Sequence, residues 1–210
     1  MSTERPYGRP DKREAVVRAA RRIFGRDGYT RASVDAIAAE AGVSKRTIYN
    51  HFTDKQSLFE AVASAGADDV TAEMARVVDR HLHKIVDIER DLIDLSRDRV
   101  AVMSAFPDYF ALARTIEAEA LHLPDSVLQA WIAAGPQTGH LRLAPYLRRL
   151  GDDGILQVDD AELAARHLTL LTVADIARQT AYGARPLPDD EVTAILTAGV
   201  RAFLRIYPPG

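Results

Sequence analysis

The sequence predicts an all-α protein with a three-helix N-terminal domain and a larger helical C-terminal domain. Three observations support this fold class: two short capped helices within 33–55, apolar residues at helical spacing along most of the chain, and no Val/Ile alternation typical of strands. We expect an arm over 1–10, a first domain over 11–61 and a second over 62–210. The last helix of the first domain is expected to continue to about residue 82.

Composition excludes several kinds of site. The 210-residue chain has no Cys, which excludes disulfides and thiolate metal sites. No stretch approaches the roughly 18 apolar residues of a membrane span, and the N-terminus has no apolar signal core, so we expect a cytoplasmic protein with no membrane contact. Residues 1–60 hold 12 Lys and Arg against 8 Asp and Glu, and the remainder holds 15 against 22. A basic end on an acidic body suits binding to phosphates.

The first helix is expected from about Asp11, where Glu14 completes a capping-box-like arrangement, to a glycine-containing end at 25–28. The residues before it include Arg5 and Arg9 among Pro and Gly. Such an arm can enter a DNA minor groove, or it is a solvated tail, which we favour.

Two short helices follow around a small-residue turn. Ser33 is a cap for the first, Gly42 supplies a turn that tolerates positive φ, and Ser44 caps a second helix over 45–52. The second helix exposes cations and hydrogen-bond donors with no acid among them, whereas an ordinary helical hairpin would expose Glu/Lys pairs. This pattern predicts a helix-turn-helix whose second helix is the recognition helix.

The run TRASVDAIAAEAGVSKRTIYNHFTDKQSLF, with the helix before it, resembles the DNA-binding domain of the TetR family of bacterial transcriptional regulators. The resemblance covers residues 11–61. It implies an all-helical homodimer with an N-terminal DNA-binding domain and a C-terminal domain for dimerisation and ligand binding.

Side-chain chemistry assigns base contacts on the recognition helix. Lys45 and Arg46 can address guanine, Asn50 can pair bidentately with adenine, and the Thr47 methyl can meet a thymine methyl. The family resemblance implies phosphate contacts instead for a second group of residues: Ser33, Tyr49, His51 and Lys55.

The rest of the chain predicts longer helices. A capping box of Thr53 and Gln56 is expected to begin the helix that runs to about Leu82. Later helices are expected over 87–105, 107–121, 124–134, 141–150, 159–183 and from 188 onward, with Gly135, Pro136 and Gly139 interrupting the chain. Pro145 either begins its helix or kinks it.

The last two helices are the most apolar. The helix over 159–183 is apolar on nearly every side, which predicts burial from both sides, and the final helix has an apolar stripe from Val192 to Leu204. The family resemblance implies that these helices form a four-helix dimer interface. The alternative is a purely intramolecular core.

An aromatic and Met set near the broken helices is our candidate for an effector pocket: Met103, Phe106, Tyr109, Phe110, Trp131 and Tyr146. The same set could be simple core. His167 and Arg178 are unusual on a mostly apolar helix and are candidate polar contacts, with a salt bridge as the alternative. These residues favour a mostly apolar effector with few charges.

Motifs for catalysis or metal binding are missing from the sequence. His81 and His83 are two residues apart and point away from each other on a helix, so we expect no metal, no cofactor and no enzyme activity. Together with the family resemblance, the helix-turn-helix predicts a ligand-responsive transcriptional repressor that binds a palindromic double-stranded DNA operator as a homodimer. The alternative is a helical dimer for protein–protein interaction with a vestigial DNA-binding head.

Overall fold

The computed structural model describes residues 12–134 and 139–210, which contain helices and no strand beyond one isolated bridge between Leu156 and Pro209. The all-α prediction is confirmed for this part of the chain. The predicted arm over 1–10 and the interruption at 135–136 lie outside the described residues. None of the described helices combines enough length and apolar character to cross a membrane.

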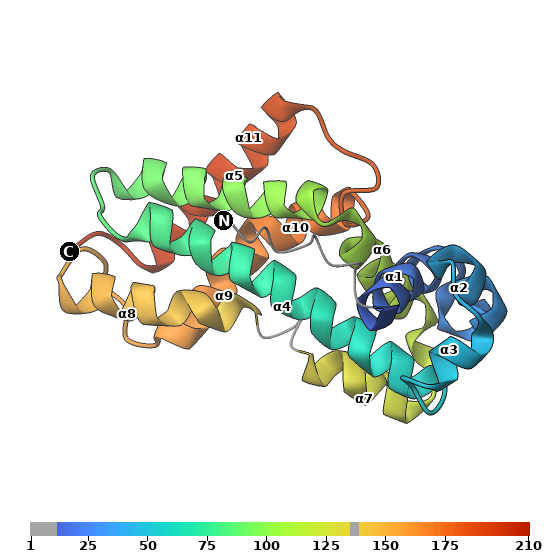
Figure 1. Ribbon diagram of the computed structural model, residues 1–210. Helices are drawn as coiled ribbons and strands as arrows, with labels where there is room; N and C mark the ends of the chain where they lie inside the picture. The colour runs from blue at the N-terminus through green and yellow to red at the C-terminus, as the bar shows by residue number, and fades with distance from the viewer. Residues whose placement is uncertain (1–11, 135–138) are drawn as a thin grey trace, which may run out of the picture.

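The N-terminal helices form one end of the molecule, and the longest helix leads away from them into the body (Figure 1). Their bounds are α1 Lys12–Arg31, α2 Val34–Ala41, α3 Lys45–Tyr49 and α4 Lys55–Leu82. The aromatic rings of Phe24, Tyr29 and Phe59 meet in the core of this end and join α1 to α4. Helix α2 packs on α1 and α3 packs on α2, so the joined pair of α1 and α4 supports both short helices.

The body is built around α4 and α5, which lie side by side in Figure 1. The remaining elements are α5 Ile88–Ala105, α6 Pro107–Glu119, η1 Ala120–His122, α7 Asp125–Ala133, η2 Gly139–Leu143, α8 Ala144–Asp152, α9 Ala161–Leu171, α10 Val173–Gln179 and α11 Asp189–Ile206. Pro145 lies in the first turn of α8, so it begins that helix.

Helix α6 carries the closest link between the body and the N-terminal end, because it packs along α1. Thr115 on α6 donates its hydroxyl hydrogen to the backbone oxygen of Gly25 at 2.8 Å. Arg21 on α1 also pairs with Asp69 on α4 at 3.5 Å. A shift of α6 therefore acts directly on the helix that supports α2 and α3.

Two predictions about helix ends were wrong. The box that begins α4 consists of Asp54 and Ser57, since Ser57 N–H donates to Asp54 Oδ1 at 2.7 Å and Asp54 N–H donates to Ser57 Oγ at 3.2 Å. Thr53 instead donates to Ser57 Oγ. Helix α3 ends at Tyr49 rather than Phe52, because Asn50 and His51 form a turn.

The expected single helix over 159–183 is also wrong. It divides at Thr172, whose backbone leaves helical geometry at φ −128° and ψ −91°. Within the single chain Leu163 and Leu170 are 42% and 57% exposed, so the predicted burial from both sides would need a second copy of the chain. Helix α11 crosses the break so closely that a Cβ on Gly199 would lie 1.9 Å from the backbone oxygen of Leu171. The division therefore follows from tertiary packing.

Candidate DNA-binding site

Local hydrogen bonds hold the turn between α2 and α3. Ser33 Oγ accepts from the backbone N–H of Ala36 at 3.1 Å and caps α2. Gly42 ends α2 with φ 65°, a left-handed conformation that glycine adopts without a steric penalty. The N–H of Val43 then donates to Ala38 O at 3.0 Å. These contacts set the direction in which α3 leaves the turn.

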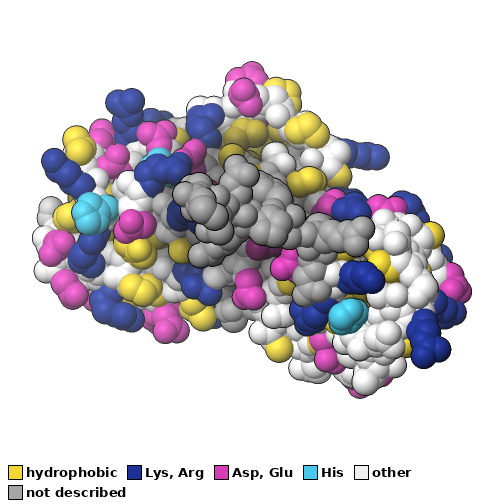
Figure 2. Space-filling model, in the orientation of Figure 1, with side chains coloured by type: hydrophobic (Ala, Val, Ile, Leu, Met, Phe, Trp, Pro, Cys, Tyr) yellow, Lys and Arg dark blue, Asp and Glu magenta, His cyan; other side chains and the backbone are white. Residues whose placement is uncertain are grey.

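Helix α3 is short and has one buried face. Ser44 Oγ accepts from the N–H of Thr47 at 3.1 Å, and Ile48 is buried. The side chains left outside are the predicted DNA-contacting ones: Lys45, Arg46, Tyr49, Asn50 and His51 are exposed and Thr47 is half-buried. Figure 2 shows Lys and Arg side chains on the surface of this end of the molecule. The structure therefore brings the predicted contacts of α3 and its following turn together.

Lys45 has a partner that the sequence analysis missed. Its Nζ lies 3.0 Å from Oδ2 of Asp35, in the first turn of α2. Hydrogen bonding to this carboxylate raises the pKa of Lys45. Asp35 thus holds the Lys45 side chain across the two helices. Arg46 is the other exposed cation of α3.

Lys55 and Ser33 lie at the margins of this surface. Lys55 Nζ donates to Thr30 O at 3.3 Å and stands 4.6 Å from the ring centroid of Tyr29, while burial lowers its pKa. Its ammonium group is held in place by the end of α1. The Ser33 hydroxyl accepts from the backbone, which leaves its own hydrogen available to a phosphate oxygen.

Arg13 is a further candidate that the sequence analysis did not name. Its guanidinium lies 5.4 Å from the ring centroid of Phe52, just beyond α3. The first turn of α1 therefore brings a cation to the side of the recognition helix. The sequence feature that could have indicated this residue is the adjacent pair Lys12 and Arg13, at the start of the helix before the helix-turn-helix.

The eight residues predicted to bind an effector lie in several places. Tyr109 packs 5.5 Å from Trp131 and 5.3 Å from Phe110, measured between ring centroids. Two more adjoin this group: Met103 is buried in a cluster against which Phe110 packs, and the backbone oxygen of Phe106 accepts from the N–H groups of Tyr109 and Phe110. The remaining three lie apart: Tyr146 lies beside Arg149, His167 shares a hydrogen bond with Tyr207, and Arg178 is exposed. Burial raises the pKa of Tyr109 to about 12.

A cleft of about 540 Å³ lies between α6 and α10. Its lining residues are Arg114, Glu117, Ala118, Ala174, Arg178, Ala181 and Tyr182, so Arg178 is the member of the predicted set that faces it. Ala181 and Tyr182 adopt positive φ values of 47° and 56°, which non-glycine residues rarely do. Arg114 donates to Ala181 O at 3.1 Å and the Tyr182 hydroxyl donates to Glu117, so α6 holds this strained turn.

A second cleft, of about 390 Å³, lies between α1 and α6, and it includes Arg22, Gly25 and Arg114 in its lining. Both clefts thus border α6. Among the residues that the structure describes, no group of three or more His, Asp or Glu is placed to hold a metal ion. His81 lies 2.8 Å from Asp98.

Two protein-family models match this chain, one in its N-terminal part and one over most of the rest. Residues 16–62 match the model of bacterial regulatory proteins of the tetR family, and residues 90–209 match that of the AefR-like transcriptional repressor C-terminal domain. The repressor Rv1474c of Mycobacterium tuberculosis is 30% identical over 147 residues, which are 68% of this chain and 71% of that protein. The repressor AcnR of Corynebacterium diphtheriae is 35% identical over 82 residues, and the match spans 39% of this chain and only 40% of that protein.

Solved structures extend the likeness to nearly the whole chain. A TetR-family transcriptional regulator from Mesorhizobium loti has a TM-score of 0.81 and 30% identity, covering 93% of this chain and 96% of that one. The flavonoid-responsive regulator FrrA has a TM-score of 0.68 and 25% identity, with the same coverage of both chains.

Proposed function

Because this chain belongs to the TetR family of bacterial regulatory proteins, we propose that it represses transcription as a homodimer on a palindromic operator and is released by a small-molecule effector. In this proposal residues 11–61 bind DNA in the cytoplasm, and residues 62–210 dimerise and bind the effector. The observation that carries it is the set of exposed side chains on α3, which includes no acid, on a turn capped at both helices.

The proposed DNA contacts divide into two kinds. Arg46, Asn50, Lys45 and Thr47 read base edges, and Ser33, Tyr49, His51 and Lys55 hold the phosphate backbone. The exposed side chains of α3 and its following turn support the first group, and the positions of Ser33 and Lys55 at the margins of this surface support the second. A cation at the margin can reach a phosphate beside the groove that α3 enters.

Effector response is proposed to act through α6. This helix packs along α1 and is bonded to it through Thr115 and Gly25. A ligand that binds in the body and shifts α6 would change the distance between the two recognition helices of a dimer, which favours a state that misfits the operator. The name of FrrA, which responds to flavonoids, supports an effector of small-molecule size.

Dimerisation is proposed through α9 and α11. Leu163 and Leu170 are seven residues apart, so they lie on the same face of helix α9, and both are exposed. An exposed apolar stripe of this kind is typical of an interface. Two copies related by a two-fold axis would bury the same stripe on each side.

The proposed function is tested by selecting DNA duplexes from a random pool with the purified protein. We expect one motif with dyad symmetry, whose half-sites lie about one helical turn or a little more apart, because a two-fold dimer presents two copies of α3. Binding should weaken steeply with salt. A protein whose function is protein–protein interaction, with a vestigial head, would enrich no motif, and that result would refute the proposal.

Leu170→Arg tests the dimer itself. We expect the variant to weaken dimerisation by roughly 100-fold or more, because each copy would place an unpaired charge in the interface. Sedimentation equilibrium at micromolar concentration should show a dimer for the unaltered chain and a monomer for the variant. Leu121→Arg is the control, since Leu121 is 95% exposed and lies in η1, outside the proposed interface. Equal behaviour of the two variants would contradict the assignment.

A further inference from the structure

Arg99 is a buried cation with no counter-charge among the residues that the structure describes. It lies on α5, its residue is only 5% exposed, and Nη2 donates to Thr169 Oγ1 on α9 at 3.0 Å. Nη1 is buried, and no described residue accepts a hydrogen bond from it. Burial alone lowers the pKa of Arg99 to about 10, with no opposing effect from a carboxylate in the described part of the chain. The guanidinium therefore stays charged at neutral pH, inside the protein.

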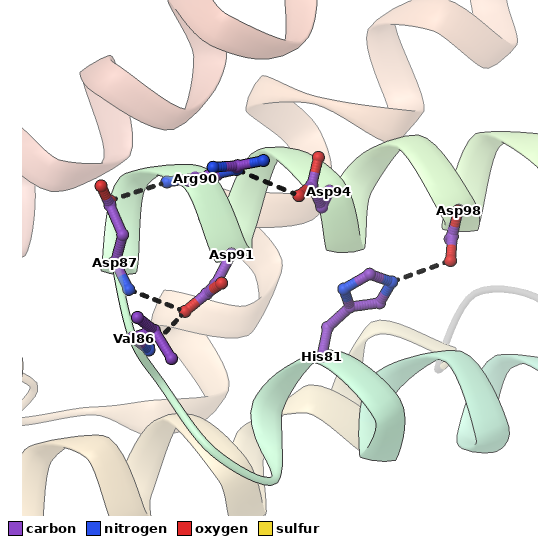
Figure 3. Close-up of polar contacts among 7 residues, drawn as sticks. All are labelled: His81, Val86, Asp87, Arg90, Asp91, Asp94 and Asp98. Carbon is purple, nitrogen blue, oxygen red and sulfur yellow. Dashed lines mark hydrogen bonds and ion pairs between the residues drawn. The ribbon is translucent and has the colours of Figure 1, made fainter.

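The acidic residues of α5 have other partners: Glu89 pairs with Arg201 at 2.8 Å, and Figure 3 shows the partners of the other three. Asp91 accepts from the backbone N–H groups of Val86 and Asp87, at 2.8 and 3.1 Å. Asp94 pairs with Arg90, and Asp98 lies 2.8 Å from His81 and 3.0 Å from Arg80. A buried, uncompensated charge is among the costliest features of a folded protein, so the lack of an acid beside Arg99 calls for a physical reason.

Ser96 supplies a second unsatisfied group on the same face of α5. It lies three residues before Arg99, is fully buried, and its Oγ has no partner among the described residues. The neighbouring buried positions on α5 are apolar: Leu95, Val102 and Met103. Among the described residues, the buried face of α5 thus combines one cation, one hydroxyl without a partner and apolar neighbours.

We propose that Arg99 and Ser96 form the anion-binding part of the effector site, and that the effector is a small molecule with one carboxylate and an apolar body. A carboxylate accepts hydrogen bonds only, so it can take one from Arg99 Nη1 and one from the Ser96 hydroxyl and satisfy both groups at once. One guanidinium balances one negative charge, which suits a monoanion. The inference rests on the proposed effector response and names the chemical class of the ligand.

The first test needs no ligand. Arg99→Met removes the uncompensated charge and keeps a long apolar side chain, so we expect the melting temperature of the free protein to rise by about 3–10 °C. A purely structural arginine would give the opposite sign, and a lower melting temperature would overturn the proposal. Arg97→Met is the matched control, because Arg97 lies on the same helix and donates to Thr193 on α11. This control is expected not to gain stability.

The second test compares three probes by thermal unfolding of the full-length protein: decanoate, decanol and inorganic phosphate. We expect decanoate to stabilise the unaltered chain and Arg97→Met more than the other two probes do, and this preference to vanish in Arg99→Met. Ser96→Ala should weaken decanoate binding about 5-fold, because it removes one hydrogen bond. Equal stabilisation by decanol or by phosphate, or a preference that survives in Arg99→Met, would overturn the inference.

Operator binding separates this inference from the proposed function. Arg99→Met lies in the body and should bind the operator as the unaltered chain does, while decanoate should release DNA only from protein that retains Arg99. If the unaltered chain binds no operator, the proposed function fails whatever the probes do. If it binds the operator and shows no preference for the carboxylate, the inference alone fails.

Discussion

Replacing Asn50 by alanine is expected to weaken operator binding by the homodimer by roughly 30-fold to 10⁴-fold. A bidentate side-chain contact to a base contributes about 1–3 kcal/mol of discrimination, and a two-fold dimer makes that contact in both half-sites. The Asn50 side chain is exposed just beyond α3, and its backbone N–H donates to Arg46 O, so the substitution should not disturb the fold. Arg46→Ala should have an effect of similar size at a different base pair.

The measurement is repeated selection of operator fragments with each variant. We expect Asn50→Ala to lose preference at one symmetric pair of positions and to keep the rest of the motif. Lys55→Met provides the contrast, because it should weaken binding to all DNA sequences equally. It should also lower the slope of binding affinity against salt concentration, both on logarithmic scales, by roughly two units, since each phosphate that the dimer neutralises adds about 0.9 to that slope. Methionine keeps an apolar chain over Tyr29, which preserves the packing at the end of α1. An unchanged motif with Asn50→Ala would show that this residue does not read a base.

The helix-turn-helix could be predicted from sequence because local rules determine it. Ser33, Gly42 and Ser44 each act within a few residues, through a cap or a backbone conformation that few residues adopt. The prediction of the capping box that begins α4 was wrong for a related reason. Thr53 and Asp54 are adjacent residues of good capping type, and only the position of Ser57 in the folded helix decides between them.

The body was harder to predict because its decisive features depend on contacts between distant helices. The prediction grouped aromatic residues that lie near broken helices. It was right for Phe110 and Trp131, which pack against Tyr109. It was wrong for Tyr146 and His167, which contact other elements. Arg99 did carry a signal. It occupies a position in the apolar stripe of α5, at helical spacing between buried residues, where a charged side chain is rare. The absence of a carboxylate beside it, among the described residues, becomes visible only in the folded protein.

The division between α9 and α10 leads to the largest stability prediction. Gly199→Ala is expected to destabilise the protein by about 3 kcal/mol, because the added Cβ would stand 1.9 Å from Leu171 O and 2.8 Å from its carbonyl carbon. Both atoms belong to the backbone, so no side chain can turn away to make room. The melting temperature should fall by roughly 6–12 °C.

Gly151→Ala is the control for this prediction. Gly151 is also a helical glycine, but its nearest neighbour, Val158 O, would stand 3.2 Å from the new Cβ. The tight contact and the gain in helix propensity, about 1 kcal/mol, should nearly cancel, so little change in stability is expected. Because α9 and α11 both border the proposed interface, Gly199→Ala should also displace Leu170 and weaken dimerisation. A melting temperature unchanged by Gly199→Ala would mean that the two helices can separate freely, and that their close crossing is not what divides α9 from α10.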